Sequence, residues 1–298
     1  MHFLIADRRP SQLPHFLTKI TRKSCVLGLY LSGMSYKLSR KIDSQNLIQN
    51  PEFQKKWKDL YEKCSWGSLF QDPRYLEIWN RNYKEVAEFI LVYETDENGD
   101  LIGLLPLSRC LKTDNLAAAG DYHAEYQSWL ATKENGDTFI AKALDLVADE
   151  FPDHRLQMMF VAPNTPMNWV EGRWADQLEL KQMPRPLVDL DENNTSSKSL
   201  RKKGNKTRIR QLKKVGDLKY EGMDSAIEFG RVFDEVEDFS RLRVSALHNA
   251  QLEKDENRKP FHIDLLKETD FVYPTLLKVG EKIASAQVCF ENRNEMLL

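Results

Sequence analysis

The sequence lacks several features that would place the protein in a specialised class. No stretch reaches the length of about 20 consecutive apolar residues that a membrane-spanning helix needs. The longest candidate, Cys25–Met34, is short and is interrupted by Gly28, Ser32 and Gly33. We therefore expect no transmembrane segment, and we interpret this stretch as part of an irregular N-terminal extension or as a short buried helix.

Cysteine is scarce, and its spacing argues against two further classes of protein. Cys25, Cys64, Cys110 and Cys289 lie far apart and show none of the Cys-x-x-Cys or Cys/His spacings of zinc sites. The same positions give no disulfide framework, so we expect no bound metal and a reducing, cytoplasmic location. The Gly-x-Ser-x-Gly motif of many hydrolases is also absent.

Acidic residues are almost missing from two segments of a chain whose formal net charge is only −2. Residues 1–41 contain one acidic residue and eight basic ones, and residues 198–219 contain one acidic residue and ten basic ones. The rest of the chain carries a net charge of −18, so the positive charge is local. This distribution argues against a surface that binds nucleic acid in bulk, and we expect no DNA partner.

The composition and the apolar spacing predict a globular α/β protein. With 298 residues, of which 41% are hydrophobic, the chain can form a large core and two domains. Apolar residues recur at helical spacing in residues 52–64, 73–84 and 137–151. Apolar runs at 89–93 and 101–107 flank a polar turn, which predicts a β-hairpin, and residues 155–161 predict a strand.

The second half of the chain repeats this order of elements. Residues 224–247 predict a helix with one apolar face, formed by Phe229, Val232, Phe233, Val236 and Phe239, and a shorter helix is expected around 262–268. A second hairpin follows, with strands that end at Val279 and run from Ile283 to Phe290, and a third strand begins at Met296. The two hairpins align at an offset of 181 residues, which predicts a tandem duplication.

We therefore expect two tandem α/β units with mixed sheets flanked by helices. The predicted parts are an N-terminal extension (1–50), a first unit (51–190, with a short strand after Arg185), a basic connector helix (191–222) and a second unit (223–298). The second unit has no counterpart of the helix and strand that follow the first hairpin. We expect the 298 residues to be a C-terminally truncated fragment.

Five stretches together resemble a known family. They are CSWGSLFQDPRYLEIW, ILVYETDENGDLIGLLPL, DYHAEYQSWL, SLRKKGNKTRIRQLKKVGDLKYE and LLKVGEKIASAQVCF. The chain from residue 52 to residue 298 resembles the CelD-like (cellulose-biosynthesis-type) acyltransferases, which are related to the GNAT superfamily and to Fem-type aminoacyl transferases. The resemblance implies tandem GNAT-like units. It also implies transfer of an acetyl or other acyl group from acetyl-CoA or another acyl-CoA to an amine or hydroxyl, often in surface polysaccharide metabolism.

The resemblance further implies where the acyl donor binds. In the family, a backbone N–H that stabilises the oxyanion and a loop that leads into a helix and holds the pyrophosphate both follow the hairpin of the active unit. For the second unit these parts lie beyond residue 298, so we expect the fragment itself to have little activity. The stretch RKKGNK partly mimics the phosphate loop, but Lys206 stands where the family requires Gly or Ala, and we reject it.

Two other functions stay open at this point. The chain could be a noncatalytic protein that binds a glycan or a protein partner through its two units. It could also be a Fem-type transferase that uses aminoacyl-tRNA as the donor.

The basic segment 199–216 has three interpretations. The first is a solvated helix that joins the units and docks by a narrow face of Leu200, Gly204, Thr207 and Val215. The second is an anion-binding site for an acyl donor or a glycan phosphate, with the candidate residues Arg201, Lys202, Lys206, Arg208 and Arg210. The third is a tRNA-binding surface, although no aromatic side chain for base stacking interrupts the basic residues.

Residues 120–130, GDYHAEYQSWL, form the second candidate site, on a predicted loop after the first hairpin. His123 and Glu125 are the candidate catalytic residues, because a histidine beside carboxylates can act as a general base. The candidate acceptor-binding residues are Asp121, Tyr122, Tyr126 and Trp129. The alternative is that Tyr126 and Trp129 pack beneath the loop while the polar side chains cap the backbone.

Overall fold

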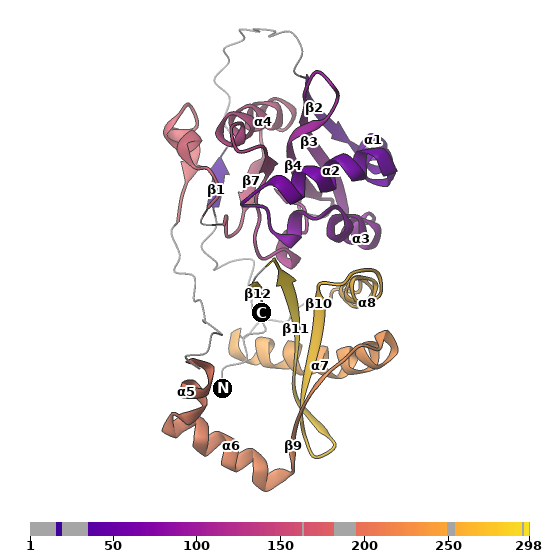
Figure 1. Cartoon of the computed structure of the whole chain (residues 1–298), viewed down its shortest axis with the longest axis vertical. Coiled ribbons are helices and arrows are strands. Elements are labelled where there is room, and N and C mark those ends of the chain that lie inside the picture. Colours follow the sequence, from indigo (N-terminus) through magenta and orange to yellow (C-terminus); the bar gives the residue numbers. More distant parts are fainter. Residues whose placement is uncertain are drawn as a thin grey trace. The chain divides into compact units, whose positions relative to one another are not determined.

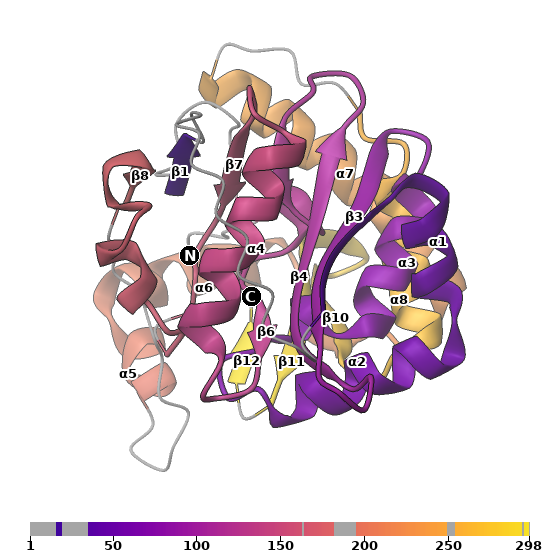
Figure 2. The ribbon, with the colours of Figure 1, turned by 90° about the horizontal axis from the view of Figure 1, so that it is seen from above.

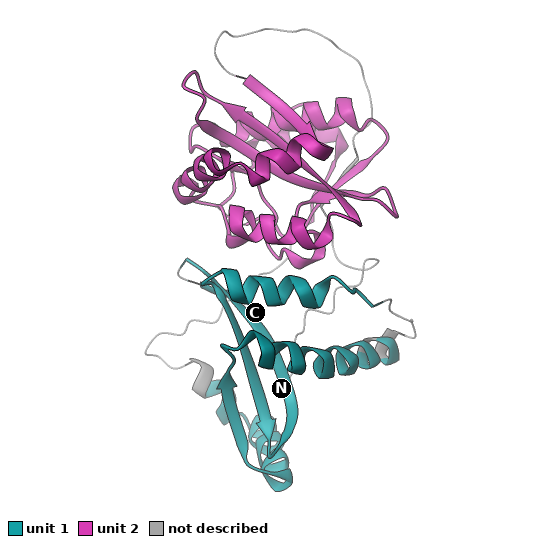
Figure 3. Cartoon of the chain, turned by 90° about the vertical axis from the view of Figure 1, so that its right-hand side faces the viewer, with its two compact units in different colours: residues 1–10, 183–298 teal, residues 11–182 magenta. Residues whose placement is uncertain are grey.

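The computed structural model describes residues 16–19, 35–162, 164–181, 195–248, 254–293 and 295–297. The chain divides into two compact units, an N-terminal unit within residues 11–182 and a C-terminal unit within residues 183–298 (Figure 3). Each unit combines helices with a β-sheet (Figure 1), which confirms the predicted α/β fold. The stretch Cys25–Met34 and the strand predicted after Arg185 lie outside the described residues.

A mixed sheet forms the centre of the N-terminal unit. Its strands are β1 (Phe16–Lys19), β2 (Ser35–Arg40), β3 (Ala87–Thr95), β4 (Leu101–Cys110), β5 (Leu116–Ala118), β6 (Leu130–Ala131), β7 (Arg155–Met158) and β8 (Leu178–Glu179). They follow the order β2-β3-β4-β5-β7-β1-β8, and β6 pairs with β4. Among the described strands, β5 and β7 form the one parallel pair, and the crossover between them contains α4 (Gly136–Glu150).

Helices cover both faces of this sheet. The helices α1 (Lys41–Gln49), α2 (Pro51–Lys63) and α3 (Pro73–Tyr83) pack on one face, and α4 packs on the other (Figure 2). Asn50 caps α2 by accepting hydrogen bonds from two backbone N–H groups, and Asp72 caps α3 in the same way with one. The apolar faces predicted for α2, α3 and α4 are buried, which confirms these three helices.

The N-terminal unit begins earlier than the sequence predicts. Residues 35–49, assigned above to an extension, form β2, which pairs with β3 along its whole length, and α1. Within α1, Ser44 donates a hydrogen bond to the Phe89 carbonyl at 2.6 Å, and Ile48 is fully buried. The strand SYKLSR has only one fully buried side chain, so its sequence shows no apolar run that would reveal it.

Glu88 of β3 joins β2 to the hairpin through two arginines. Arg40 of β2 donates to the Glu88 carboxylate at 2.9 and 3.1 Å, and Arg109 of β4 contacts it at 2.8 Å. Burial by itself raises the pKa of Glu88. The hydrogen bonds and charges of Arg40 and Arg109 outweigh burial and hold this pKa below its ordinary value.

We expect Glu88→Gln to lower the free energy of unfolding by about 1–3 kcal/mol at pH 7, because an amide cannot replace charge-assisted hydrogen bonds to two arginines. A carboxylate with a lowered folded-state pKa contributes stability above its unfolded pKa, near 4.5, and loses it as the pH falls through the folded value. Urea unfolding of both proteins at a series of pH values should therefore show a difference that shrinks in acid. A difference independent of pH would assign the effect to packing.

Gly103 of β4 lies where α4 approaches the sheet. A Cβ atom at this position would clash with the ring of Phe139, which is fully buried. We expect Gly103→Ala to destabilise the protein by about 1–3 kcal/mol, the cost of overpacking a core. The matched control is Gly204→Ala on an exposed helix, where nothing lies within 4 Å and alanine should stabilise by up to about 1 kcal/mol. Calorimetric melting of the two variants checks these opposite signs.

The C-terminal unit contains a smaller sheet. Its elements are α5 (Thr195–Arg201), α6 (Lys203–Val215), β9 (Leu218–Gly222), α7 (Ala226–His248), α8 (Arg258–Glu268), β10 (Val272–Val279), β11 (Lys282–Asn292) and β12 (Glu295–Leu297). The strand order is β12-β11-β10-β9, and every pair in the described residues is antiparallel, which corrects the mixed sheet predicted for this unit. The expected hairpin and third strand are present as β10, β11 and β12.

Helix α7 supplies the core of this unit. Phe229 and Val232 are buried against Met223 and Leu276, and the cluster extends along α7 as far as Val236. Phe239, predicted on the same face, is 62% exposed because this core cluster does not reach it. At the start of α7 the Ser225 hydroxyl caps the helix by accepting a hydrogen bond from the Glu228 N–H at 3.3 Å.

The two units share one order of elements. In the N-terminal unit, β2 is followed by helices α1 to α3 and then by β3, β4 and β5. In the C-terminal unit, β9 is followed by α7 and α8 and then by β10, β11 and β12. In both, the first strand pairs with the first hairpin strand and the last strand pairs with the second. This order supports a duplication whose repeat starts at β2 and at β9.

Candidate functional site

The parallel pair of β5 and β7 marks the candidate site. In sheets with parallel strands, ligands bind outside the carboxyl ends of the strands, at the point where the connections diverge. In this unit the carboxyl end of β5 is followed by the loop 119–135, and that of β7 by the segment that starts at Met159. The predicted stretch 120–130 therefore lies at the carboxyl ends of β5 and β7, where a ligand site is expected. We call this end of the two strands the edge of β5 and β7.

Gln127 fixes the loop 119–135 to the segment after β7. Its N–H donates to the Met159 carbonyl at 3.1 Å, and the Met159 N–H donates back to the Gln127 side-chain oxygen at 2.7 Å. The Gln127 side-chain nitrogen donates to the Asp121 carbonyl at 2.7 Å. Because Gln127 is buried and fully engaged, it holds the loop in place and does not contact a ligand.

The loop turns sharply at its start. Gly120 and Asp121 both adopt left-handed backbone conformations, with φ values of 90° and 43°. A Cβ atom on Gly120 would lie 2.7 Å from the Cβ of Ala124, so this turn requires glycine. A short 3-10 helix, Asp121–His123, follows the turn and carries three of the predicted site residues.

His123 is held by two tyrosines of α3. Its Nε2 lies 2.6 Å from the Tyr83 hydroxyl, and its carbonyl accepts a hydrogen bond from the Tyr75 hydroxyl at 2.8 Å. The centroid of the His123 ring lies 5.0 Å from that of Tyr83 and 4.0 Å from that of Tyr122. Both the ring and the backbone of this histidine are therefore oriented by α3. Tyr75 and Tyr83 are site residues that the sequence did not reveal, because they belong to a helix whose aromatic residues read as core.

Asp121 is an unusual carboxylic acid. Burial raises its pKa to about 6, and a hydrogen bond from the Tyr122 backbone opposes this effect only in part. A carboxyl group with this pKa changes its charge close to neutral pH, where an ordinary aspartate is already ionised. Perturbed carboxyl groups of this kind gather at functional sites.

The remaining predicted residues of this loop divide into two groups. Tyr122 is 45% exposed at the edge, and Glu125 and Tyr126 are half-buried. Trp129 is fully buried instead of lining a site, since its indole N–H donates to the Gly136 carbonyl at 3.0 Å. Trp129 therefore packs beneath the loop, which was the alternative to its predicted role as an acceptor contact.

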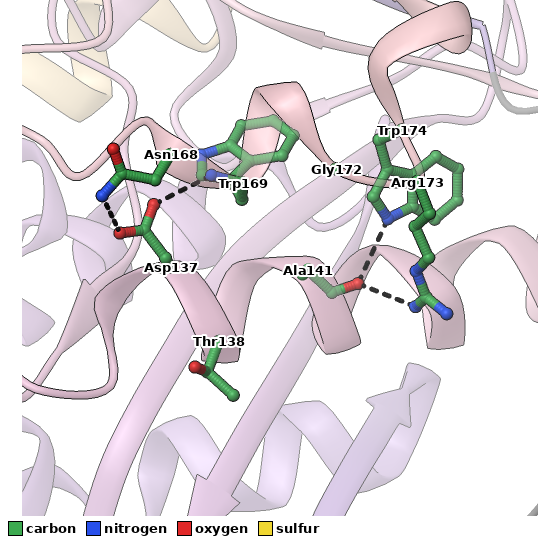
Figure 4. A pocket seen from close by; sticks show the side chains of 8 residues that line it. All are labelled: Asp137, Thr138, Ala141, Asn168, Trp169, Gly172, Arg173 and Trp174. Carbon is green, nitrogen blue, oxygen red and sulfur yellow. Dashed lines mark hydrogen bonds between the residues drawn. The ribbon is translucent and has the colours of Figure 1, made fainter.

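A shallow depression of about 420 Å³ lies beside this loop, on the outer side of α4 (Figure 4). Asp137 in the first turn of α4 accepts hydrogen bonds from the Asn168 side chain and the Trp169 backbone N–H. Trp169 also packs edge-on against Trp129, with ring centroids 5.8 Å apart. None of the predicted site residues lines this depression, so it does not enlarge the candidate site.

The basic segment is helical, as predicted, but it breaks at Lys202 between α5 and α6. The predicted docking face is wrong: Leu200 and Val215 are 48% and 72% exposed. The partly covered face of α6 consists of Asn205, Ile209, Leu212 and Gly216. The candidate residues Arg201, Lys202, Lys206, Arg208 and Arg210 are all exposed. RKKGNK runs from the end of α5 into the first turn of α6, with a helix and not a strand before it.

Within the described residues, no helix is long and apolar enough to cross a membrane, and no group of three or more His, Cys, Asp or Glu side chains could hold a metal ion. Cys64, Cys110 and Cys289, the cysteines of the described residues, are not joined in disulfide bonds. The chain matches no protein-family model, and no curated protein sequence matches it.

Proposed function

We propose that the protein is an acyltransferase that moves an acetyl or other acyl group from an acyl-CoA to an amine or hydroxyl of a surface polysaccharide or its precursor. The edge of β5 and β7 holds the acceptor. The observation that carries this proposal is the 2.6 Å contact between His123 Nε2 and the Tyr83 hydroxyl at that edge. The resemblance to CelD-like acyltransferases supplies the reaction class, and a cytoplasmic location belongs to the same proposal.

In this proposal His123 is the general base. In the tautomer whose Nε2–H donates to the Tyr83 oxygen, Nδ1 is the basic nitrogen of the ring, and in this proposal it takes the proton of the acceptor. The acceptor nitrogen or oxygen attacks the thioester carbonyl, and a C–N or C–O bond forms as the C–S bond breaks. The departing CoA thiolate then takes up a proton. Tyr83 is a positioning residue, because it selects the tautomer and the orientation of the base.

Asp121 and Tyr122 provide the contacts for the acceptor. Above about pH 6 the Asp121 carboxyl group is ionised and attracts a protonated amine. The Tyr122 ring is exposed beside His123 and offers a flat apolar face to a sugar ring. An amine that binds in its protonated form then loses its proton to His123 before it attacks.

The first turn of α4 does not suit the acyl donor. A helix N-terminus binds phosphate through free N–H groups and the positive end of the helix dipole. In α4 the Asp137 carboxylate occupies this turn and accepts the Trp169 N–H at 3.1 Å. Its negative charge repels a pyrophosphate, so we assign the acceptor and not the acyl-CoA to the N-terminal unit.

The test is acceptor-dependent CoA release by the full-length protein. Acetyl-CoA and longer acyl-CoAs are offered with a panel of amino sugars and neutral oligosaccharides, and the free thiol is measured. We expect saturable release that requires both substrates. Binding of an oligosaccharide without release from any acyl-CoA would instead support a noncatalytic glycan-binding protein.

A further inference from the structure

Five basic residues of α6 lie along one side of the helix. With about 100° of rotation per residue, Lys203, Lys206, Arg210, Lys213 and Lys214 fall within an arc of about 100°. We call this set the α6 stripe. Arg208, a candidate from the sequence, lies outside the arc, whereas Lys203, Lys213 and Lys214 were not among the candidates. The helix thus places five charges of the basic segment in one row.

The charges of the α6 stripe are not neutralised by neighbouring side chains. Residues 195–216 contain no acidic residue. Within the described part of the chain, no basic side chain between 198 and 214 forms an ion pair with a carboxylate. All five stripe residues are exposed. Positive charges in one row repel one another and destabilise the helix. A helix that is only solvated would gain stability from acidic residues at i, i+4 spacing, and α6 has none.

The helix is anchored so that the stripe points away from its own unit. The partly covered residues Ile209 and Leu212 lie on a different side of α6 from the stripe. At the end of α6, the Asp217 carbonyl accepts a hydrogen bond from the Gly280 N–H at 2.8 Å, in the turn between β10 and β11. In Figure 1, α6 continues through a short connection into β9 of the sheet. The stripe is therefore a fixed feature of the unit.

We propose that the α6 stripe binds the sugar–phosphate backbone of a double-stranded nucleic acid. From Lys203 to Lys214 the helix rises by about 16 Å. One strand of a duplex presents a phosphate about every 3.4 Å along the axis, so this length faces about five phosphates, one for each stripe residue. Clustering of lysine and arginine along one helix face is the electrostatic pattern of such a surface.

Other polyanions fit the stripe less well. A helix that lies in a membrane surface needs a broad apolar face rich in Trp, Phe or Leu, and the apolar residues Ile209 and Leu212 of α6 are turned towards its own unit. A single-stranded nucleic acid binds through aromatic stacking as well as charge, and residues 198–216 contain no aromatic side chain. Outside residues 1–41 and 198–219 the chain carries a net charge of −18, which disfavours contact of that part with a duplex. The expectation of no DNA partner followed from this overall charge, and the α6 stripe is a local exception to it. This site is separate from the acyl-transfer site and does not depend on it.

The test measures binding of a fluorescent 20-base-pair duplex by anisotropy over a range of salt concentrations, with RNA and DNA versions of one sequence. The stripe variant changes Lys203, Lys206, Arg210, Lys213 and Lys214 to Gln, which keeps helix propensity. Its charge-matched control changes five exposed lysines of the N-terminal unit to Gln, namely Lys55, Lys63, Lys84, Lys133 and Lys181. Circular dichroism and melting verify that both variants fold.

For the unchanged protein, the logarithm of affinity should fall with the logarithm of salt concentration with a slope of about −4 to −5. The stripe variant should lose at least tenfold in affinity at low salt and most of the slope, whereas the control variant keeps both. Equal binding by the two variants, or binding of anionic vesicles without binding of either duplex, would overturn the proposal. The RNA and DNA arms decide which duplex geometry the stripe accepts.

Two variants with fewer substitutions test the same proposal if the five substitutions disturb the helix. Lys206→Gln combined with Arg210→Gln should reduce the slope by about 2. Arg208→Gln, on the same helix but outside the stripe, should leave the slope unchanged, whereas loss of one phosphate contact would change it by about 0.9. An equal effect of these two variants would show that total charge and not the row controls binding.

Discussion

His123→Ala is expected to lower kcat of acyl transfer by about 100- to 10,000-fold, the range that one general base contributes. The substitution removes the ring whose Nε2 contacts Tyr83, and with it the general base of the proposed mechanism. The KM for the acceptor should change little, because the substitution keeps Asp121 and Tyr122, the acceptor contacts of the proposed function. Initial rates of CoA release over a range of acceptor concentrations and pH values separate kcat from KM.

Two further variants distinguish catalysis from structure. His154→Ala removes a histidine at the opposite, amino end of β7, where its Nε2 contacts Asp114 at 3.0 Å, and it should leave the rate within about twofold. Tyr83→Phe keeps the ring but loses the contact to Nε2, so we expect a loss of about tenfold and a shifted pH profile. Added imidazole should restore part of the activity of the His123→Ala enzyme. A full rate for that enzyme, or an equal loss for His154→Ala, would remove His123 from the mechanism.

Asp121→Asn is expected to stabilise the protein by about 1–3 kcal/mol at pH 7 to 8. The folded-state pKa of Asp121, about 6, lies above the ordinary value of 3.8, so the folded protein holds this proton more tightly than the unfolded chain. Between these two values the stability of the wild-type protein falls as the pH rises, because ionising a buried carboxyl group is unfavourable. Asparagine does not ionise, so its advantage should grow from about pH 4 to about pH 6 and stay constant above.

Urea unfolding from pH 4 to pH 8 measures this dependence of stability on pH. Kinetic measurements show whether the gain in stability lowers activity. A stabilising substitution at a functional position commonly lowers activity. We therefore expect Asp121→Asn to raise the KM for an amine acceptor above pH 6 and to leave that for a hydroxyl acceptor nearly unchanged. If Asp121→Asn is less stable than the wild type at pH 7, the ionised carboxylate stabilises the loop instead of destabilising it.

The sequence predicts the parts of the fold that follow from local periodicity. Helix α2 follows from the spacing of Phe53, Trp57 and Leu60, and the first hairpin follows from its two apolar runs around Asn98-Gly99-Asp100. The sequence does not predict strand β2, because this strand becomes part of the sheet only through its pairing with β3. The exposure of Phe239 likewise depends on where the core ends, which no pattern within α7 reveals.

The candidate site, too, can be predicted from the sequence only in part. The loop 120–130 is recognisable because it concentrates His, Asp and Tyr residues after a hairpin. The partner of His123 is Tyr83, 40 residues earlier on α3, and only the packing of that helix brings the two together. The pKa of Asp121 depends on burial, and the role of Trp129 depends on its hydrogen bond to Gly136. Burial and long-range contacts are properties of the fold, so residue types alone could not assign them.

The most direct test of the account follows an isotope-labelled acetyl group from acetyl-CoA by mass spectrometry of the acceptor. With the complete gene product, the label should appear on the amine or hydroxyl of an amino sugar or oligosaccharide. The His154→Ala enzyme should label the acceptor as fast as the wild type, and the His123→Ala enzyme should label it at least 100-fold more slowly, the lower limit for loss of a general base. Release of the label only as free acetate, or equal labelling by the His123→Ala enzyme, would contradict an acyl transfer based on the edge of β5 and β7.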